Sequence, residues 1–190
     1  MIQTLSKPTD QRLIHSGVSW QQFQLIQEAF SDSPGIRLSY YKGEVEIFAV
    51  SQDHEIFSGT IAGLLFIYFA DKEIEFFPTG TCTQEKEGVA SAQADESYCI
   101  GTQKKTPDLS IEVVFTSGTL SKLKRYQELG VLEVWFWEDG LFTIHHLRVS
   151  GYERIYHSEV LPDLDIDLLS RCLLMTSRVE AVKEFRRGIS

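Results

Sequence analysis

The spacing of apolar and polar residues predicts an alternation of helices and strands from residue 19 to residue 187. Some segments carry apolar residues at helical spacing, whereas shorter apolar runs bounded by turn residues indicate strands. Helices are expected at 19–30, 54–71 and 116–129, and one or two more at 166–187. Strands are expected at 36–41, 44–50, 73–78, 97–100, 106–115, 132–137, 141–146 and 152–156.

The order of these elements predicts an α/β (α+β) fold in which helices flank a mixed β-sheet. Residues 1–17 are expected to be a flexible leader, and residues 18–190 a single domain. Residues 79–96 are expected to be extended and rich in loops. Ser19 begins a capping box at the first helix, and Asp53 is expected to cap the second.

The strand at 106–115 contains two acidic residues, Asp108 and Glu112, inside a nearly continuous apolar run that indicates burial on both faces. Ionised carboxylates are costly in such a place unless a cation or a hydrogen-bond network compensates them. Lys122 follows on the expected first turn of the next helix. Two carboxylates and a lysine are the usual parts of a metal-dependent phosphodiester hydrolase, so the pattern predicts a nuclease-like site.

Strand geometry restricts this hypothesis. Four strand residues span about 13 Å, which is too far for Asp108 and Glu112 to share one ion. The strand must therefore bend or bulge near Leu109 and Ser110, or Asp108 must lie on a turn before the strand begins. If neither holds, the two acids are not a metal pair. The structural alternative is that Asp108 caps a turn and that Glu112 forms an ion pair with Lys122.

Composition permits an ordinary core, because 43% of the 190 residues are hydrophobic and 24% are charged. The net charge of −9 counts against binding to DNA, which normally depends on a basic surface. One stretch is locally basic: between residues 101 and 130, five basic residues stand against three acidic ones. These basic residues are Lys104, Lys105, Lys122, Lys124 and Arg125.

The chain shows no apolar run of eighteen residues, so no membrane span is expected, and residues 1–10 lack the apolar region of a secretory signal. Cys82, Cys99 and Cys172 are far apart and odd in number. This pattern favours a reducing compartment and buried thiols over a disulfide or zinc framework. A cytoplasmic location is therefore expected.

A set of short motifs lies in a fixed order from Trp20 to the C-terminal helices. The motifs are Arg37-Leu38-Ser39-Tyr40, Gly43-Glu44-Val45-Glu46-Ile47, His54-Glu55, Asp95-Glu96-Ser97-Tyr98, Pro107-Asp108-Leu109, Glu112-Val113, Lys122-Leu123, Tyr126, Leu129-Gly130-Val131 and Glu133-Val134-Trp135. The ordered set resembles the cyanobacterial Uma-type restriction endonuclease family of the PD-(D/E)XK nuclease superfamily. The resemblance implies a mixed sheet with a helix on each side.

The resemblance also implies roles for individual residues. Asp108 and Glu112 resemble the two metal-binding acids, and Lys122 resembles the lysine that this family takes from the following helix. Glu46 resembles an additional acid, with Glu44 as a close competitor on the same strand face. In the superfamily pattern the lysine lies two residues after the strand acid, where this chain has Val114. Activity therefore requires Lys122 to reach the site from the helix.

The expected chemistry is hydrolysis of DNA by an endodeoxyribonuclease. Glu46, Asp108 and Glu112 would hold Mg²⁺ or Mn²⁺, which would polarise the scissile phosphate and help to generate hydroxide. Lys122 would position the attacking water and offset the charge of the phosphate. The alternative is a catalytically inactive module of the same fold that binds or regulates, with a homodimer as its expected assembly.

Several other residues have a chemical and a structural interpretation. Tyr126 either orients Lys122 or packs in the core. His54 is interpreted as a residue at a helix start rather than a ligand. Asp95 and Glu96 could supply acids if the site lies near their loop, but they are interpreted as turn residues. The acidic residues at 163, 165 and 167 are expected to place charge at a helix N-terminus.

Overall fold

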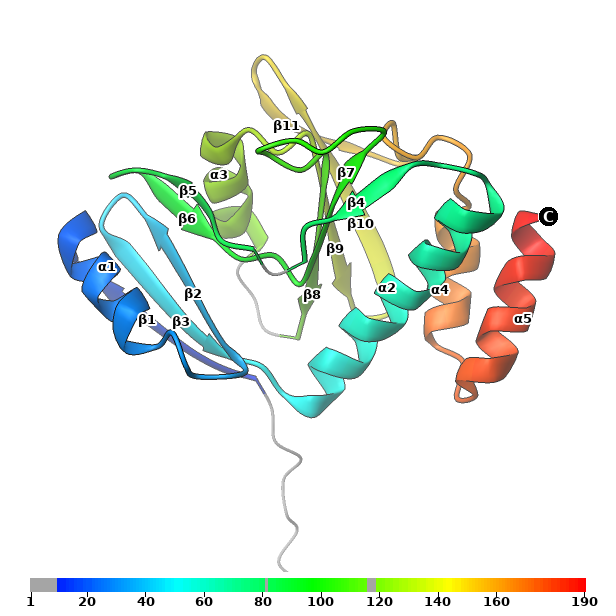
Figure 1. Cartoon of the computed structure of the whole chain (residues 1–190), viewed down its shortest axis with the longest axis horizontal. Coiled ribbons are helices and arrows are strands. Elements are labelled where there is room, and N and C mark those ends of the chain that lie inside the picture. Colours follow the sequence, from blue (N-terminus) through cyan, green and yellow to red (C-terminus); the bar gives the residue numbers. More distant parts are fainter. Residues whose placement is uncertain (1–9, 81, 116–118) are drawn as a thin grey trace, which may run out of the picture.

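The computed structural model describes residues 10–80, 82–115 and 119–190, and its strands form two sheets (Figure 1). In the smaller sheet every neighbouring pair of strands is antiparallel. Its strand order is β1 (Gln11–Ser16), β3 (Glu44–Ala49), β2 (Ile36–Tyr41), β6 (Ala90–Ala92) and β5 (Gln84–Lys86).

The larger sheet is mixed, as predicted. Its strand order is β11 (Gly151–Ile155), β10 (Leu141–Arg148), β9 (Glu133–Glu138), β8 (Leu109–Val114), β7 (Glu96–Ile100) and β4 (Phe76–Pro78). Strands β8 and β9 are parallel, and the other neighbours are antiparallel. A parallel pair needs a crossover connection, which helix α3 (Thr119–Leu129) supplies.

Helices cover both faces of the larger sheet. One face packs against α2 (Gln52–Asp71), α4 (Ile166–Leu173) and α5 (Arg178–Ile189) around the main apolar core. Helix α3 packs on the other face and also contacts β6, so it lies between the two sheets (Figure 1). Helix α1 (Trp20–Ala29) packs on the smaller sheet through Phe23. The prediction of an α+β fold with a mixed sheet between helices is confirmed.

Alternation along β8 determines which side chains face which helix. Leu109, Ile111 and Val113 belong to the core beneath α2, whereas Val114 belongs to the core beneath α3. Every residue of β8 is buried, as the apolar run predicted. Because Glu112 lies two residues before Val114, the period of two puts its carboxylate on the α3 side of the sheet.

Two helix starts were predicted from capping residues. Ser19 and Gln22 form the predicted capping box of α1. Helix α2 is instead capped by Ser51, whose side chain accepts from the backbone N–H of His54, so the prediction of Asp53 as the cap is wrong. Asp53 lies in the first turn, where a negative charge favours the helix dipole. The expected helix start at 116–118 lies outside the described residues.

Two segments contain more structure than predicted. Residues 11–16, expected in a leader, form β1 at the edge of the smaller sheet, and residues 79–96, expected to be loop-rich, contain β5 and β6. Most side chains of β1 are exposed, so its sequence lacks the alternation that marks a half-buried strand. The second sheet, to which β1, β5 and β6 belong, was therefore not predicted.

Two other predictions concern the burial of the cysteine thiols and membrane-spanning helices. Cys99 and Cys172 are buried thiols, as expected, whereas Cys82 is exposed, and all three are free. Among the helices that the structure describes, none is long and apolar enough to cross a membrane.

A buried carboxylate fixes the connection between β11 and α4 to the larger sheet. Glu133 is fully buried and accepts hydrogen bonds from the Trp135 indole at 2.6 Å and the Ser158 hydroxyl at 2.5 Å. The backbone N–H groups of Glu159 and Val160 also donate to it, at 2.9 and 3.3 Å. One side chain thus satisfies donors from a strand and from a loop that has no secondary structure of its own.

We expect Glu133→Ala to lower the free energy of unfolding by about 2–4 kcal/mol, because it leaves several buried donors without an acceptor. Urea denaturation at neutral pH measures the change. Glu153→Ala is the control: it removes an exposed carboxylate paired with Arg148 and should cost no more than about 1 kcal/mol. Equal losses in the two variants would contradict the role assigned to Glu133.

Candidate active site

Acidic and basic side chains converge in a small cavity where the two sheets meet. The cavity has a volume of about 20 Å³, which is room for roughly one water-sized particle. Its lining comes from β2, β3, β6, β8, α3 and the β6–β7 connection. The charged residues of the lining are Glu46, Asp95, Glu112, Arg37, Lys122 and Arg125.

Glu112 is held by two residues of α3. Lys122 Nζ donates to Glu112 Oε2 at 2.5 Å, and the Tyr126 hydroxyl donates to Glu112 Oε1. Lys122 and Tyr126 are four residues apart, so both reach the sheet from one helix face. Burial, together with the charge of Glu112, raises the pKa of Tyr126 well above its usual value. Tyr126 therefore stays a donor and orients Glu112, and it also packs in the core, which is one of the two roles expected from the sequence.

Asp95 directly precedes β7 and lines the same cavity as Glu112. The register of β7 and β8 pairs Glu96 with Ile111. The Asp95 backbone N–H also donates to the Ile111 carbonyl, at 3.1 Å, so Asp95 and Glu96 both lie opposite Ile111, as the two residues of a β-bulge do. The Val113 N–H donates to Asp95 Oδ2 at 2.5 Å. This bond fixes the Asp95 carboxylate to β8 at the residue that follows Glu112.

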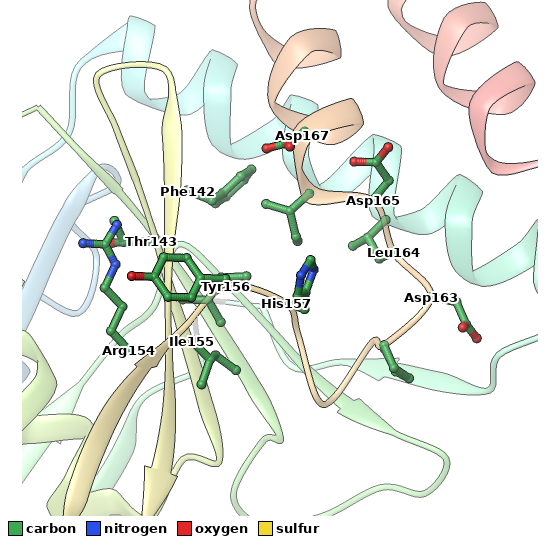
Figure 2. Close-up of a pocket in the computed structure, with 13 residues that line it drawn as sticks. Phe142, Thr143, Arg154, Ile155, Tyr156, His157, Asp163, Leu164, Asp165 and Asp167 are labelled. Atoms are coloured by element: carbon green, nitrogen blue, oxygen red, sulfur yellow. The ribbon is translucent and has the colours of Figure 1, made fainter.

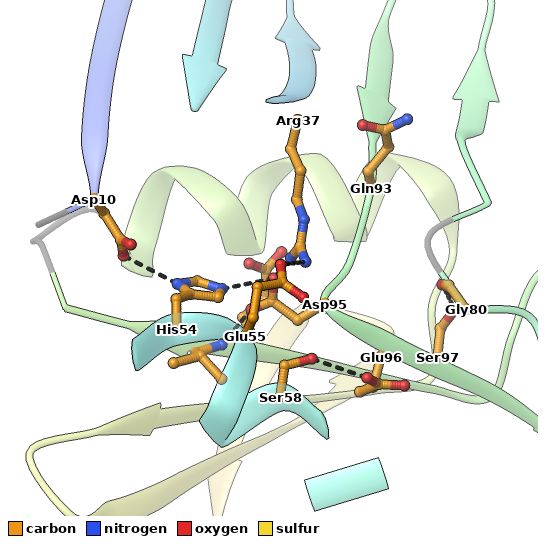
Figure 3. Close-up of polar contacts among 12 residues, drawn as sticks. Asp10, Arg37, His54, Glu55, Ser58, Gly80, Gln93, Asp95, Glu96 and Ser97 are labelled. Carbon is orange, nitrogen blue, oxygen red and sulfur yellow. Dashed lines mark hydrogen bonds and ion pairs between the residues drawn. The ribbon is translucent and has the colours of Figure 1, made fainter. Parts of the chain in front are cut away.

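Two further contacts complete the surroundings of Asp95 (Figure 3). Arg37 forms an ion pair with Asp95 through Nη1 and donates from Nη2 to Glu55 at 3.0 Å. His54 Nε2 lies 2.8 Å from Asp95 Oδ1. The neighbouring acid, Glu96, points instead toward α2, where the Ser58 hydroxyl donates to it at 2.8 Å. Of the two acids interpreted as turn residues, Asp95 is therefore the one in the cavity.

Glu46 enters the cavity from β3 of the smaller sheet. Its carboxylate accepts from Arg12 Nε and from Arg125 Nη1, both at 2.7 Å. Burial disfavours the ionised form, but Arg125, Arg12 and Lys122 outweigh burial and lower the pKa of Glu46 to about 2. Its competitor Glu44 lines a different cavity, beside Lys42 and Lys124. Glu46, and not Glu44, thus shares a cavity with Glu112.

Asp108 lies apart from this group. It directly precedes β8, and its side chain accepts from the Ile100 N–H at 2.8 Å and from Lys104 Nζ at 2.7 Å. Strand β8 keeps a continuous register with β9 from Leu109 to Val114, so no bulge shortens the path from Asp108 to Glu112. Asp108 and Glu112 therefore lie toward opposite ends of β8, and Asp108 does not line the cavity.

The structure thus brings together Glu46, Glu112 and Lys122 of the predicted site residues. Arg37 and Arg125 were not singled out as site residues, and Asp95 was set aside. One signal was available for Arg125, which lies three residues after Lys122 and so shares its helix face. The position of Asp95 depends on the β7–β8 register, which the sequence pattern does not reveal.

The donor chemistry of the cavity fits a divalent cation such as Mg²⁺. Within residues 10–80, 82–115 and 119–190, no three His, Cys, Asp or Glu side chains form a group that could hold a metal ion. Mg²⁺, however, is commonly bound by one or two carboxylates, with waters and substrate phosphates as its other ligands. Asp95 and Glu112 supply two such carboxylates, one from the β6–β7 connection and one from β8.

A separate cavity of about 410 Å³ lies between β10, β11 and the start of α4 (Figure 2). Its lining includes Asp163, Asp165 and Asp167, and Figure 2 shows that their carboxylates do not point at one another. Asp165 is the N-cap of α4, where it accepts from the Leu168 N–H at 2.9 Å, and Asp167 lies in the first turn. The expected role of these two residues at a helix N-terminus is confirmed.

Comparison with known proteins places the chain in a family. The sequence model of the Uma2 family, described as "Putative restriction endonuclease", matches residues 20–175, and the chain belongs to this family. The resemblance drawn from the motifs is therefore confirmed.

Among solved structures, the chain is similar to the crystal structure of "a putative nuclease belonging to DUF820 from Anabaena variabilis ATCC 29413". The TM-score is 0.49 and the sequence identity 14%, over 78% of this chain and 90% of that chain. No curated protein matches the chain in sequence.

The lowered pKa of Glu46 predicts a specific pH dependence of stability. Its folded-state pKa of about 2 lies below the ordinary 4.5, so the fold favours the ionised form. This stabilisation is fully present above the ordinary pKa and is lost as the pH falls toward 2. In Glu46→Gln the side chain cannot ionise. The difference in unfolding free energy between the two proteins should therefore shrink by up to about 3 kcal/mol on acidification.

Chemical denaturation of both proteins between neutral pH and the acid limit of folding measures this difference. Glu44→Gln serves as the matched control, because it alters the same strand face in a different cavity. A difference that stays constant down to the acid limit would show that Glu46 is not preferentially ionised in the fold.

Proposed function

We propose that the protein is an endonuclease that hydrolyses DNA phosphodiester bonds with a divalent metal ion held by Asp95 and Glu112. The observation that carries this proposal is that these two buried carboxylates line one cavity, where Asp95 Oδ2 accepts from the N–H of the residue after Glu112 and Lys122 Nζ lies 2.5 Å from Glu112. The description of the family supports the same class of activity. Mg²⁺ is the proposed ion, and Mn²⁺ is its functional substitute.

The residues of the cavity divide the chemistry between them. A bound divalent ion would supply Lewis acidity and lower the pKa of a coordinated water. Lys122, beside Glu112, orients that water and offsets negative charge on the scissile phosphate. The planar guanidinium of Arg125 provides a further phosphate contact. Glu46 holds Arg125 through the 2.7 Å ion pair and so acts as a positioning residue.

Local charge supports a polyanionic substrate although the whole chain carries a net charge of −9. Four basic side chains, those of Arg12, Arg37, Lys122 and Arg125, contact the three carboxylates of the cavity. With the metal bound, the group would carry an excess of positive charge at the place where a phosphate must lie. Electrostatic attraction of this kind dominates the affinity of proteins for DNA.

One observation favours the alternative function, a nucleic-acid-binding module without catalysis. Each carboxylate of the cavity already pairs with a basic side chain: Glu46 with Arg125, Asp95 with Arg37 and Glu112 with Lys122. A protein of this kind would bind DNA without cleaving it, and its affinity would not depend on a divalent ion.

Plasmid cleavage tests the proposal. We expect the wild-type protein to nick supercoiled DNA of mixed sequence in Mg²⁺ or Mn²⁺, and Asp95→Asn and Glu112→Gln to reduce the rate by about 100-fold or more. Asp108→Asn distinguishes the two assignments of the second acid, because only the Asp95 assignment predicts a smaller effect there. Gel quantification of nicked and linear products gives the rates.

Glu28→Gln, an exposed substitution on α1, controls for purification and should cleave like the wild type. A larger loss in Asp108→Asn than in Asp95→Asn would overturn the assignment of Asp95. Cleavage that is equal in all variants indicates a contaminating nuclease and contradicts the proposed site. Binding of DNA without cleavage, in either metal and over a random-sequence library, would establish the binding module instead.

A further inference from the structure

We infer that His54 is a positioning residue that holds the Asp95 carboxylate in its metal-binding orientation, and that Asp10 fixes the His54 ring from the opposite side. The inference rests on the proposed function, because it concerns the same site. Neither the motifs nor the family assigns a role to this pair. The sequence alone suggested only that His54 begins a helix.

The three side chains form a buried row across the structure (Figure 3). His54 is in the first turn of α2 and is 0% exposed. Its Nε2 lies 2.8 Å from Asp95 Oδ1, and its Nδ1 lies 2.9 Å from Asp10 Oδ2. Both ring nitrogens thus face carboxylates, and the ring joins the segment before β1 to the segment before β7.

Asp10 is itself fixed by the backbone. Its Oδ1 accepts from the Ser51 N–H at 2.8 Å, and Ser51 is the residue that caps α2. The Asp10 carboxylate therefore binds the start of the helix through one oxygen and the imidazole of His54 through the other. It cannot rotate without losing one of these two bonds in a buried environment, where an unsatisfied polar group is costly.

Aromatic packing restricts the His54 ring further. The ring of Phe48 lies 5.5 Å from it at an interplanar angle of 60°, and the ring of Phe115 lies 5.8 Å from it at 90°. Both contacts have the edge-to-face geometry that aromatic rings prefer. Packing and hydrogen bonds together leave the imidazole little freedom to turn away from Asp95.

The fixed His54 ring restricts how the two carboxylate oxygens of Asp95 can be used. Oδ1 faces both His54 and Arg37, whereas Oδ2 accepts only the Val113 N–H at 2.5 Å among the contacts that the described residues show. A carboxylate oxygen has two lone pairs, so Oδ2 keeps one for a ligand. With Oδ1 fixed, the carboxylate has a defined orientation in the cavity that it shares with Glu112. Residues that orient a metal ligand in this way commonly change metal affinity 10–100-fold when they are replaced.

A purely structural role is the competing explanation, because the same bonds also attach α2 to the segment before β1. Two substitutions separate the explanations. In His54→Gln the amide nitrogen can reach the place of Nε2 and keep a donor toward Asp95. In His54→Asn the shorter amide reaches only the place of Nδ1, toward Asp10. Both remove the ring and its packing, so their effects on stability should be similar.

The experiment measures Mn²⁺ binding to the full chain by calorimetry, with thermal unfolding of the metal-free protein measured in parallel. We expect His54→Asn to weaken Mn²⁺ binding by about 10–100-fold, and His54→Gln to keep it within about threefold of the wild type. The two variants should unfold at similar temperatures. Asp10→Asn keeps the ring and should weaken binding by about tenfold.

The outcomes separate this inference from the proposed function. If the wild type binds Mn²⁺ and His54→Asn binds it equally well, His54 is only structural and the inference is wrong, while the proposed metal site stands. If His54→Asn does not fold, Asp10→Asn becomes the test instead. Unchanged Mn²⁺ binding by Asp10→Asn would then overturn the inference. If the wild type itself does not bind Mn²⁺ in the presence or absence of DNA, the proposed metal site fails, and this inference fails with it.

Discussion

The compensation of three buried carboxylates is the constraint on which the site depends. Glu46 comes from the smaller sheet, Glu112 from the larger sheet and Asp95 from the connection between them, and ionised groups in such surroundings need partners. The partners come from other elements: Arg12 from β1, Arg37 from β2, and Lys122 and Arg125 from α3. These ion pairs link α3 to both sheets, alongside the apolar packing of Leu123 and Tyr126. The residues of the site are therefore also residues that connect the two sheets.

The parts of the fold that could be predicted are those whose information is local. The alternation in β8 and the position of Lys122 on α3 put Glu112 and Lys122 in contact, and both follow from periodicity within short segments. Strand β1 and the short strands β5 and β6 carry no such pattern, since their residues are largely exposed or their length is three residues. The second sheet depends on pairing between distant segments, so its existence could not be derived from any one of them.

Asp95 and Asp108 show the same limit at the level of single residues. Each comes just before a strand of the larger sheet, and in the sequence Asp108 is the nearer to Glu112. Distance along an extended chain grows by about 3.3 Å per residue, so proximity in sequence puts Asp108 at the wrong end of β8. The antiparallel pairing with β7 instead brings Asp95, seventeen positions away, into the cavity that Glu112 lines. The spacing of residues along a strand therefore speaks against Asp108 and Glu112 as a pair, but it does not identify Asp95 as the acid that shares the cavity with Glu112.

The concentration of buried ion pairs in one cavity favours a functional role for these residues over a purely stabilising one. Replacing a buried ion pair with apolar residues of similar size is often neutral or stabilising, so stability alone is a weak reason to keep Glu46, Asp95 and Glu112 with their partners. The proposed function provides a stronger reason. Arg37 and Lys122 form ion pairs with Asp95 and Glu112. Under the proposed function, a divalent ion would take over the neutralisation of these carboxylates, and the same basic groups would then face a phosphate. The same basic side chains would then compensate the buried carboxylates before substrate binds and stabilise the negative charge of the substrate afterwards.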